Sequence, residues 1–112
     1  MDWIQGVYEA FNARDLEAAL SHMHPDVDWP NGWQGGRIHG REAVRDYWTR
    51  QFGSIDSHVE PLEHTVSGDR VAVTVHQVVR DLEGNVMSDG RTRHVYTLRD
   101  GLVARMDIVS LS

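Results

Sequence analysis

The spacing of apolar residues changes once along this chain, at Gly53, and this change restricts the fold more than any other feature. Before Gly53 the apolar residues recur every three or four positions, which is typical of amphipathic helices. After it they alternate or cluster between turn residues, as in β-strands. Helices followed by consecutive strands predict an α+β fold with an antiparallel sheet, because a parallel sheet needs strands and helices in alternation.

The first half of the chain contains three expected helices. One covers residues 3–11, a second follows Asp15 as its N-cap, and a third covers residues 41–53. Between the last two we expect a short strand that includes Trp29 and then a glycine-rich loop over residues 32–40.

The second half contains four expected strands, over residues 58–66, 71–79, 89–99 and 102–109. Pro61 cannot donate a backbone hydrogen bond and therefore places the first of them at a sheet edge. The run of valines in the second predicts a central strand that is buried on both faces. Gly90 is expected to mark a bulge that curves the sheet.

Composition limits the function classes. A chain of 112 residues is expected to form one domain, residues 1–112, with one core and one pocket. It has no cysteine, and all eleven basic residues are Arg, which excludes thiolate and Schiff-base chemistry. The formal charge of -6 opposes nucleic-acid binding, and the absence of a long apolar run or a basic leader predicts a cytoplasmic protein without membrane contact.

Several segments resemble the nuclear transport factor 2-like superfamily. They are residues 8–16 (YEAFNARDL), 24–29 (HPDVDW) and 40–45 (GREAVR). Residues 94–101 (HVYTLRDG) and 105–107 (RMD) resemble its SnoaL-like polyketide cyclase and ketosteroid isomerase-like branch. The resemblance implies a cone in which three N-terminal helices pack on a curved antiparallel sheet and enclose one pocket, with no cofactor.

The last hairpin carries the candidate chemistry. If residues 100–101 form a two-residue turn, counting outward places His94 opposite Asp107. Tyr96 and Arg105 would then share their face of the sheet. The resemblance to SnoaL-like cyclases implies that His94 and Asp107 form an acid-base pair. From their place on the same face, we expect Tyr96 and Arg105 to donate hydrogen bonds to a developing enolate.

The other face of this hairpin also carries apolar residues, among them Val95, Met106 and Ile108. An exposed apolar sheet face favours a homodimer that packs sheet to sheet.

Aromatic residues indicate what the pocket could hold. Trp29, Trp33, Tyr47 and Trp48 are candidates to line it and suit a flat polycyclic or terpenoid ligand, although helix packing alone would also explain Tyr47 and Trp48. We expect a small apolar ligand that bears a carbonyl group. His76, in the middle of a valine-rich strand, is a further candidate for substrate binding or for a core position.

The ketosteroid isomerase machinery is not matched. Trp29 precedes Pro30 where that family has its catalytic aspartate, and Val7 aligns with its oxyanion-hole tyrosine, one residue before Tyr8. A SnoaL-like lyase or isomerase is therefore the first hypothesis for function. A non-catalytic small-molecule-binding or interaction module with the same cone is the second.

Two further alternatives stay open. Arg105 and Asp107 have the spacing of the limonene epoxide hydrolase arrangement, in which an arginine between two carboxylates activates water, and Asp28 or Asp89 would have to supply the second carboxylate. His22 and His24 could form part of a metal site, although histidines at a helix end are also favoured by the helix dipole, and we predict no metal.

Overall fold

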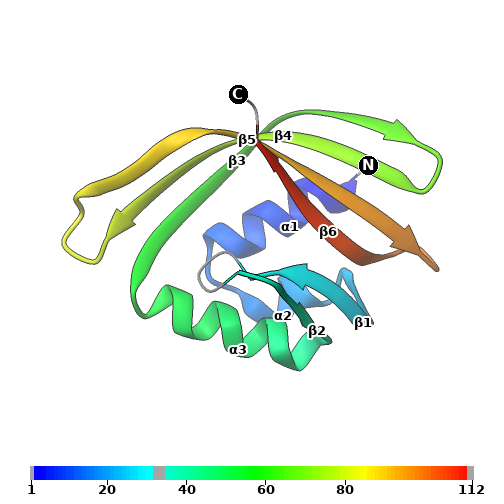
Figure 1. Ribbon diagram of the computed structural model, residues 1–112, viewed down its shortest axis with the longest axis horizontal. Helices are drawn as coiled ribbons and strands as arrows, with labels where there is room; N and C mark the ends of the chain where they lie inside the picture. The colour runs from blue at the N-terminus through cyan, green and yellow to red at the C-terminus, as the bar shows by residue number, and fades with distance from the viewer. Residues whose placement is uncertain (1, 32–34, 111–112) are drawn as a thin grey trace.

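The computed structural model describes residues 2–31 and 35–110. Its elements are α1 (Asp2–Asn12), α2 (Leu16–Leu20), β1 (Met23–Pro30), β2 (Arg37–His39), α3 (Arg41–Phe52), β3 (Ile55–Ser67), β4 (Arg70–Asp81), β5 (Val86–Arg99) and β6 (Leu102–Ser110). The curved sheet arches over the helices, which lie together beneath its concave face (Figure 1). None of the described helices has the length and apolar character that crossing a membrane requires.

The six strands form one sheet in the order β2-β1-β6-β5-β4-β3. β1 pairs with β6 in parallel, and the other neighbours are antiparallel. The sheet is therefore mixed, whereas the sequence predicted antiparallel pairing only. The difference arises because β1 comes early in the chain and docks against the last strand, a long-range pairing that local patterns do not specify.

The three helices begin where the sequence predicts. The Asp15 side chain accepts a hydrogen bond from the Ala18 N–H at 3.2 Å and so caps α2. α3 begins after Gly40, whose φ of 89° favours glycine, and ends before Gly53. The apolar stripes of α1 and α3 are buried against the sheet, which makes the space between helices and sheet the core of the protein.

Side chains at and just after the end of α1 attach it to the edge strand β3. The Asn12 amide donates to the Val59 carbonyl at 2.7 Å and accepts from the Val59 N–H at 2.9 Å. Arg14 adds a hydrogen bond to the Ser57 carbonyl at 2.8 Å. These bonds satisfy backbone groups on an unpaired edge and fix α1 over the concave face.

Irregularities in the strands lie at different places from those predicted. Pro61 is on the edge strand as expected, and a register shift follows it. Gly90 pairs regularly with Gln77, so the predicted bulge there is wrong, and the shift in β5 lies near Met87 instead. β4 is central, but within this chain only one of its faces is fully buried, by Val71, Val73 and Val75, while the opposite face is half-buried.

A bulge in the last hairpin has the largest consequence for function. Asp100 and Gly101 form the predicted turn, with φ of 55° and 77°, as a two-residue type I′ hairpin turn requires. The pairing of Leu98 with Val103 also follows the prediction, but Thr97 then pairs with Arg105. Ala104 is therefore an extra residue in β6, and every later side chain moves to the other face.

Candidate functional site

A cavity of about 340 Å³ lies between helices α1 and α3 and the concave face of the sheet. Its volume falls in the range of small-molecule sites. Most of its wall is apolar or aromatic, and the aromatic side chains come from α1, β1, α3 and β5: Tyr8, Phe11, Trp29, Tyr47, Trp48 and Tyr96. The polar residues on the wall are two glutamines and one histidine, Gln51, Gln77 and His94, together with the tyrosine hydroxyls.

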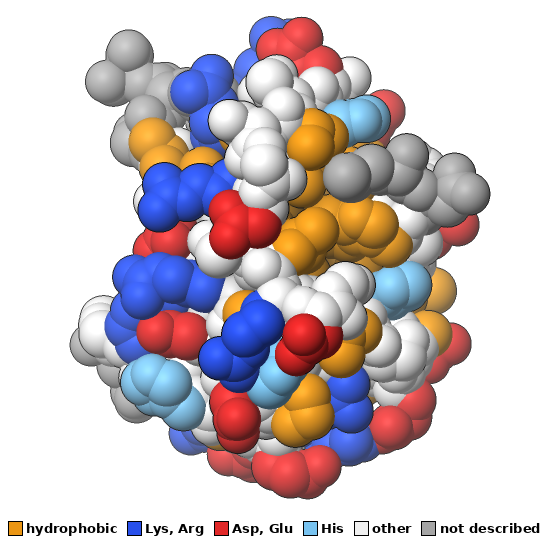
Figure 2. All heavy atoms as spheres, turned by 90° about the vertical axis from the view of Figure 1, so that its right-hand side faces the viewer, with side chains coloured by type: hydrophobic (Ala, Val, Ile, Leu, Met, Phe, Trp, Pro, Cys, Tyr) orange, Lys and Arg blue, Asp and Glu red, His pale blue; other side chains and the backbone are white. Residues whose placement is uncertain are grey.

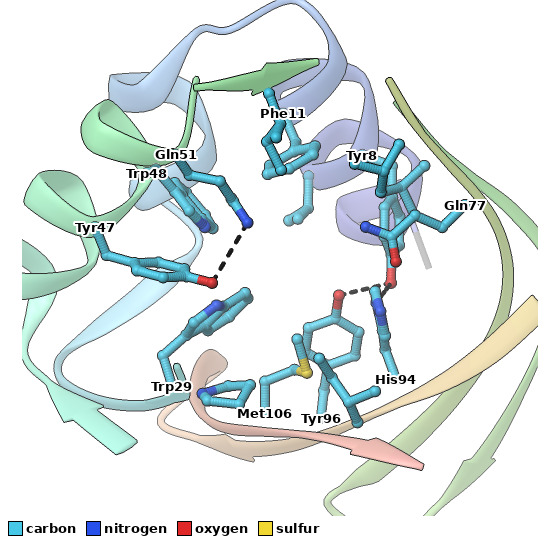
Figure 3. A pocket seen from close by; sticks show the side chains of 16 residues that line it. Tyr8, Phe11, Trp29, Tyr47, Trp48, Gln51, Gln77, His94, Tyr96 and Met106 are labelled. Atoms are coloured by element: carbon cyan, nitrogen blue, oxygen red, sulfur yellow. Dashed lines mark hydrogen bonds between the residues drawn. The ribbon is translucent and has the colours of Figure 1, made fainter. Parts of the chain in front are cut away.

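Three polar side chains of this wall form one hydrogen-bonded cluster. The Tyr8 hydroxyl lies 2.8 Å from His94 Nδ1 and 2.6 Å from the Tyr96 hydroxyl. Figure 3 shows Tyr8 entering from α1 while His94 and Tyr96 rise from the sheet, so that the three polar ends meet at one side of the cavity. We call Tyr8, His94 and Tyr96 the Tyr–His cluster.

Burial keeps the whole Tyr–His cluster uncharged at neutral pH. Removal from water lowers the pKa of His94 to about 4, because the imidazolium loses its hydration. Burial, with the neighbouring Tyr96, raises the pKa of the Tyr8 hydroxyl above its usual value. Burial also raises the pKa of Tyr96, against the opposing effect of its hydrogen bond with Tyr8.

The hydrogen bonds of the Tyr–His cluster can run in either of two directions, depending on which nitrogen of His94 carries the proton. If the Tyr8 hydroxyl donates to His94 Nδ1, the Tyr96 hydroxyl can donate to Tyr8, and the Tyr96 oxygen keeps only acceptor capacity. If His94 Nδ1–H donates to Tyr8, the Tyr8 hydroxyl can donate to Tyr96, and the Tyr96 hydroxyl is free to donate to a ligand. The cluster can therefore present either an acceptor or a donor to the cavity.

Five of the residues chosen from sequence line the cavity: His94, Tyr96, Trp29, Tyr47 and Trp48. Trp29 and Trp48 meet edge to face with ring centres 5.4 Å apart, so they form a continuous aromatic wall. Trp33, the remaining tryptophan of the prediction, lies outside the described residues.

The predicted cross-strand pairing of His94 with Asp107 is wrong. The bulge at Ala104 places Ile108 opposite His94 and Asp107 opposite Val95. Met106 and Ile108 consequently face the cavity, whereas Arg105 and Asp107 point to the outer face of the sheet. The pattern of apolar residues in β6 contained this signal, because strict alternation from Val103 would have turned two charged residues inward.

Arg105 and Asp107 belong to an ion-pair network on the outer face. Arg105 binds Asp107 at 2.9 Å and Asp28 at 3.1 Å, and Arg37 binds Asp28 at 2.5 Å and Asp107 at 3.0 Å. A hydrogen bond and charge from Arg105 lower the pKa of Asp107. The pKa of Asp28 is also lowered, because burial, which would raise it, is outweighed by the hydrogen bond and charge of Arg37 together with the charges of His39 and Arg105. Figure 2 shows acidic and basic side chains next to one another on the left of the face that it displays, beside hydrophobic side chains in its centre.

This network bears on the hydrolase alternative. Arginines do lie between two carboxylates, as that arrangement requires, and Asp28 supplies the second one. The carboxylates are on the opposite face of the sheet from the cavity, however, because Trp29 and Met106, their neighbours in sequence, line it. The prediction that they point into the pocket is wrong.

His76 was a candidate for the pocket, and its placement is also wrong. Val71, Val73 and Val75 take the inward positions of β4, so the alternation turns His76 outward. There its Nε2 lies 2.5 Å from Asp89 Oδ1. His24 lies near Arg99, at 3.2 Å from its guanidinium, and the described residues contain no group of three potential metal ligands.

Sequence reasoning missed Tyr8, the centre of the cluster. It assigned this residue to the apolar stripe of the first helix, which is correct for its ring. A buried tyrosine needs a hydrogen-bond partner for its hydroxyl, and this requirement was the signal that the stripe also carries a polar function.

Comparison with known families and structures agrees with this geometry. Residues 4–106 match the model of the SnoaL-like domain. The comparison with curated proteins gave no match.

Three solved structures share the fold over almost the whole chain. TerC, co-crystallized with polyporic acid, is 32% identical, with 95% of this chain and 86% of TerC covered and a TM-score of 0.83. An NTF2-like protein of unknown function from Burkholderia pseudomallei is 26% identical, with 94% and 85% covered and a TM-score of 0.83. A candidate polyketide cyclase from Sinorhizobium meliloti is 26% identical, with 96% and 94% covered and a TM-score of 0.83.

The matched segment spans both the helices and the strands that enclose the cavity. The structure also has the cone expected for nuclear transport factor 2-like proteins, with three helices under a curved sheet. This chain belongs to the SnoaL-like domain family, within the nuclear transport factor 2-like superfamily.

Proposed function

We propose that this protein binds a small, flat, mostly apolar ligand through a carbonyl or hydroxyl oxygen and catalyses a proton transfer on it without a cofactor. Such a step would make it an isomerase, cyclase or lyase. The observation that supports the proposal is the Tyr–His cluster, in which one hydroxyl bridges an imidazole and a second hydroxyl on the wall of an aromatic cavity.

Tyr96 is the member of the cluster that would touch the ligand oxygen. When a carbon beside a carbonyl loses a proton, negative charge develops on that oxygen, and a hydroxyl already placed in a dry cavity stabilises it without reorganising solvent. Removing one such donor from an enzyme typically costs about 10²–10³ in kcat. Tyr8 would orient Tyr96, since their oxygens are 2.6 Å apart.

His94 is the base of this proposal. Because burial keeps its ring neutral, one ring nitrogen can accept a proton at neutral pH. A pKa of about 4 makes it a weak base, and an oxyanion bound nearby would strengthen it by stabilising the imidazolium. The proposal assigns this role to His94 without Asp107, since that carboxylate is engaged by Arg37 and Arg105.

The solved relatives support the ligand class. TerC, which was co-crystallized with polyporic acid, is 32% identical in sequence to this chain. The Sinorhizobium meliloti relative is a candidate polyketide cyclase. We therefore propose aromatic, oxygen-bearing compounds as ligands.

A non-catalytic binding module is the second candidate function. It is favoured by one observation: no carboxylate lines the cavity in the part of the chain that is described, so His94 has no acidic partner there. A module of this kind would use the Tyr–His cluster only to recognise a ligand oxygen.

Exchange of hydrogen for deuterium separates the two functions. The protein would be incubated in D₂O with 2-tetralone, a flat ketone whose carbon-bound α-hydrogens are acidic, and deuterium uptake would be followed by mass spectrometry. Polyporic acid binding would be measured in parallel by calorimetry. The enzyme proposal expects exchange above the solvent rate that falls about 10²-fold in Tyr96→Phe.

Each outcome supports one reading. If either compound binds but the exchange is not accelerated, the proposed catalysis is rejected and the binding module is supported. Acceleration that persists in both Tyr96→Phe and His94→Gln would show that the cluster is not the catalyst.

We also propose that the protein forms a homodimer through the outer face of its sheet. That face carries half-buried apolar side chains, Ala72 and Val95, and exposed Val109 beside the ion-pair network. Light scattering after size exclusion would test the dimer, and Val95→Arg should convert it to a monomer. A wild-type protein of monomer mass would refute the proposal.

A further inference from the structure

The cavity has a second polar site, formed by Tyr47 and Gln51, and we propose that its ligand carries an oxygen at each end. This inference rests on the proposed function and specifies its ligand: an elongated aromatic molecule with a hydroxyl or carbonyl group at both termini. The Tyr–His cluster would hold one terminus, and Tyr47 with Gln51 would hold the other.

Tyr47 and Gln51 lie on the same face of α3 because they are four residues apart. Gln51 Nε2 is 3.4 Å from the Tyr47 hydroxyl, and both residues line the cavity. Figure 3 shows the Gln51 amide and the Tyr47 hydroxyl directed into the cavity from the side opposite His94 and Tyr96. The two polar sites therefore face each other across the cavity.

The wall between them is apolar. In Figure 3, Phe11 lies above the gap and Trp29 and Met106 lie below it, while Trp48 lies beside Gln51 and packs against Trp29. Aromatic walls favour a flat ligand, which can contact them over its whole length. A polar group in the middle of the ligand would lose its hydration here without a partner.

Gln51 has unused hydrogen-bonding capacity. A distance of 3.4 Å is longer than the 2.7–3.2 Å of an ordinary N–H···O bond, and it is the only side-chain hydrogen bond of Gln51 within the described residues. Its amide offers two N–H donors and one carbonyl acceptor. A ligand hydroxyl or carbonyl group placed beside it would form shorter bonds than the one that Gln51 makes with Tyr47.

Gln77, the other glutamine of the wall, serves as a comparison. Its Nε2 donates to the Ser57 hydroxyl at 2.9 Å, a well-formed bond to a buried partner. That bond holds the Gln77 amide against β3. The second polar site is thus assigned to Gln51 and not to Gln77.

A series of biphenyls tests the inference. Biphenyl, 4-hydroxybiphenyl and 4,4′-dihydroxybiphenyl share one flat apolar body and differ only in terminal hydroxyls. Their dissociation constants would be measured by calorimetry, with quenching of tryptophan fluorescence as a second readout. One added hydrogen bond should make the dihydroxy compound bind about tenfold more tightly than the monohydroxy compound.

Two variants locate the effect. Gln51→Leu and Tyr47→Phe should each bring the affinity ratio between these two compounds close to one, while 4-hydroxybiphenyl still binds. Gln5→Leu, which changes an exposed glutamine on α1, is the matched control and should keep the ratio. Circular dichroism would confirm that each variant is folded.

The failures of this inference and of the proposed function are distinguishable. If the wild type binds 4-hydroxybiphenyl and its dihydroxy analogue equally, the second site is refuted and the proposed function stands. A tenfold ratio that survives in both Gln51→Leu and Tyr47→Phe also refutes it. If neither the biphenyls nor polyporic acid bind, the proposed function fails, and this inference fails with it.

Discussion

Acidification should destabilise this protein through one residue, His94. The folded protein holds this histidine neutral, with a pKa lowered by burial to about 4 from an ordinary value of 6.5. Between these two values the unfolded chain binds a proton that the folded chain does not. Lowering the pH therefore favours unfolding, and the stability that depends on a neutral His94 is complete above pH 6.5 and falls until about pH 4.

The two pKa values set the magnitude. At about pH 5 the unfolded histidine is almost fully protonated and the folded one is about one-tenth protonated, which corresponds to a loss of about 2 kcal/mol relative to neutral pH. Below the folded pKa the loss reaches its limit of about 3 kcal/mol. Because His94 is only 7% exposed, solvent screening does not reduce these figures substantially.

Neighbouring carboxylates do not interfere at this pH. The pKa values of Asp28 and Asp107 are lowered from 3.8, so their contribution to stability is present above that value and is lost only as the pH falls below it. A comparison between neutral pH and pH 5 therefore isolates the histidine from these two groups.

Urea unfolding of three proteins would measure the effect. The free energy of unfolding of the wild type should fall between about pH 8 and pH 5 by about 2 kcal/mol more than that of His94→Gln. His58→Gln, which changes an exposed histidine, should behave as the wild type does. Equal losses in wild type and His94→Gln would refute the argument, as would a loss that disappears in His58→Gln.

Three other predictions concern the structure that surrounds the cavity. Tyr8→Phe removes the hydroxyl that bridges His94 and Tyr96 and should lower the free energy of unfolding by about 1–3 kcal/mol in urea titrations; an unchanged midpoint would contradict the cluster. Asn12→Ala removes both hydrogen bonds to the Val59 backbone and should cost about 2 kcal/mol, seen as a lower thermal midpoint than that of an Asn85→Ala control in an exposed turn. Deleting Ala104 should prevent cooperative folding, measured by circular dichroism on heating, because it would turn charged residues into the cavity; a stable deletion variant would contradict the role of the bulge.

Local features of the chain were readable from the sequence. Helix α2 follows its predicted cap, Asp15, and the last hairpin turns at Asp100 and Gly101, because caps and two-residue turns depend on a few adjacent residues. The edge position of Pro61 was also readable, since a missing N–H restricts a residue wherever it occurs. These properties need no knowledge of distant parts of the chain.

The candidate site depended on contacts between distant segments. His94 and Tyr96 were identified from their strand, but their partner Tyr8 comes from a helix more than eighty residues away in sequence. A tyrosine in an apolar stripe has the same local pattern whether its hydroxyl meets a histidine or water. Only the packing of α1 on the sheet distinguishes these cases.

By itself, the sequence determined an α+β order of three helices followed by strands, because the spacing of apolar residues records which side of each element is buried. The cone with its pocket followed from the resemblance to the nuclear transport factor 2-like superfamily. Tertiary structure alone decided which charged residues face that pocket. One extra residue, Ala104, moved Asp107 and Arg105 to the outer face and brought Met106 inward. Since side chains on a strand alternate with a period of two, a single bulge reverses every assignment after it, and its position is set by how the strand must bend to close the sheet around the helices.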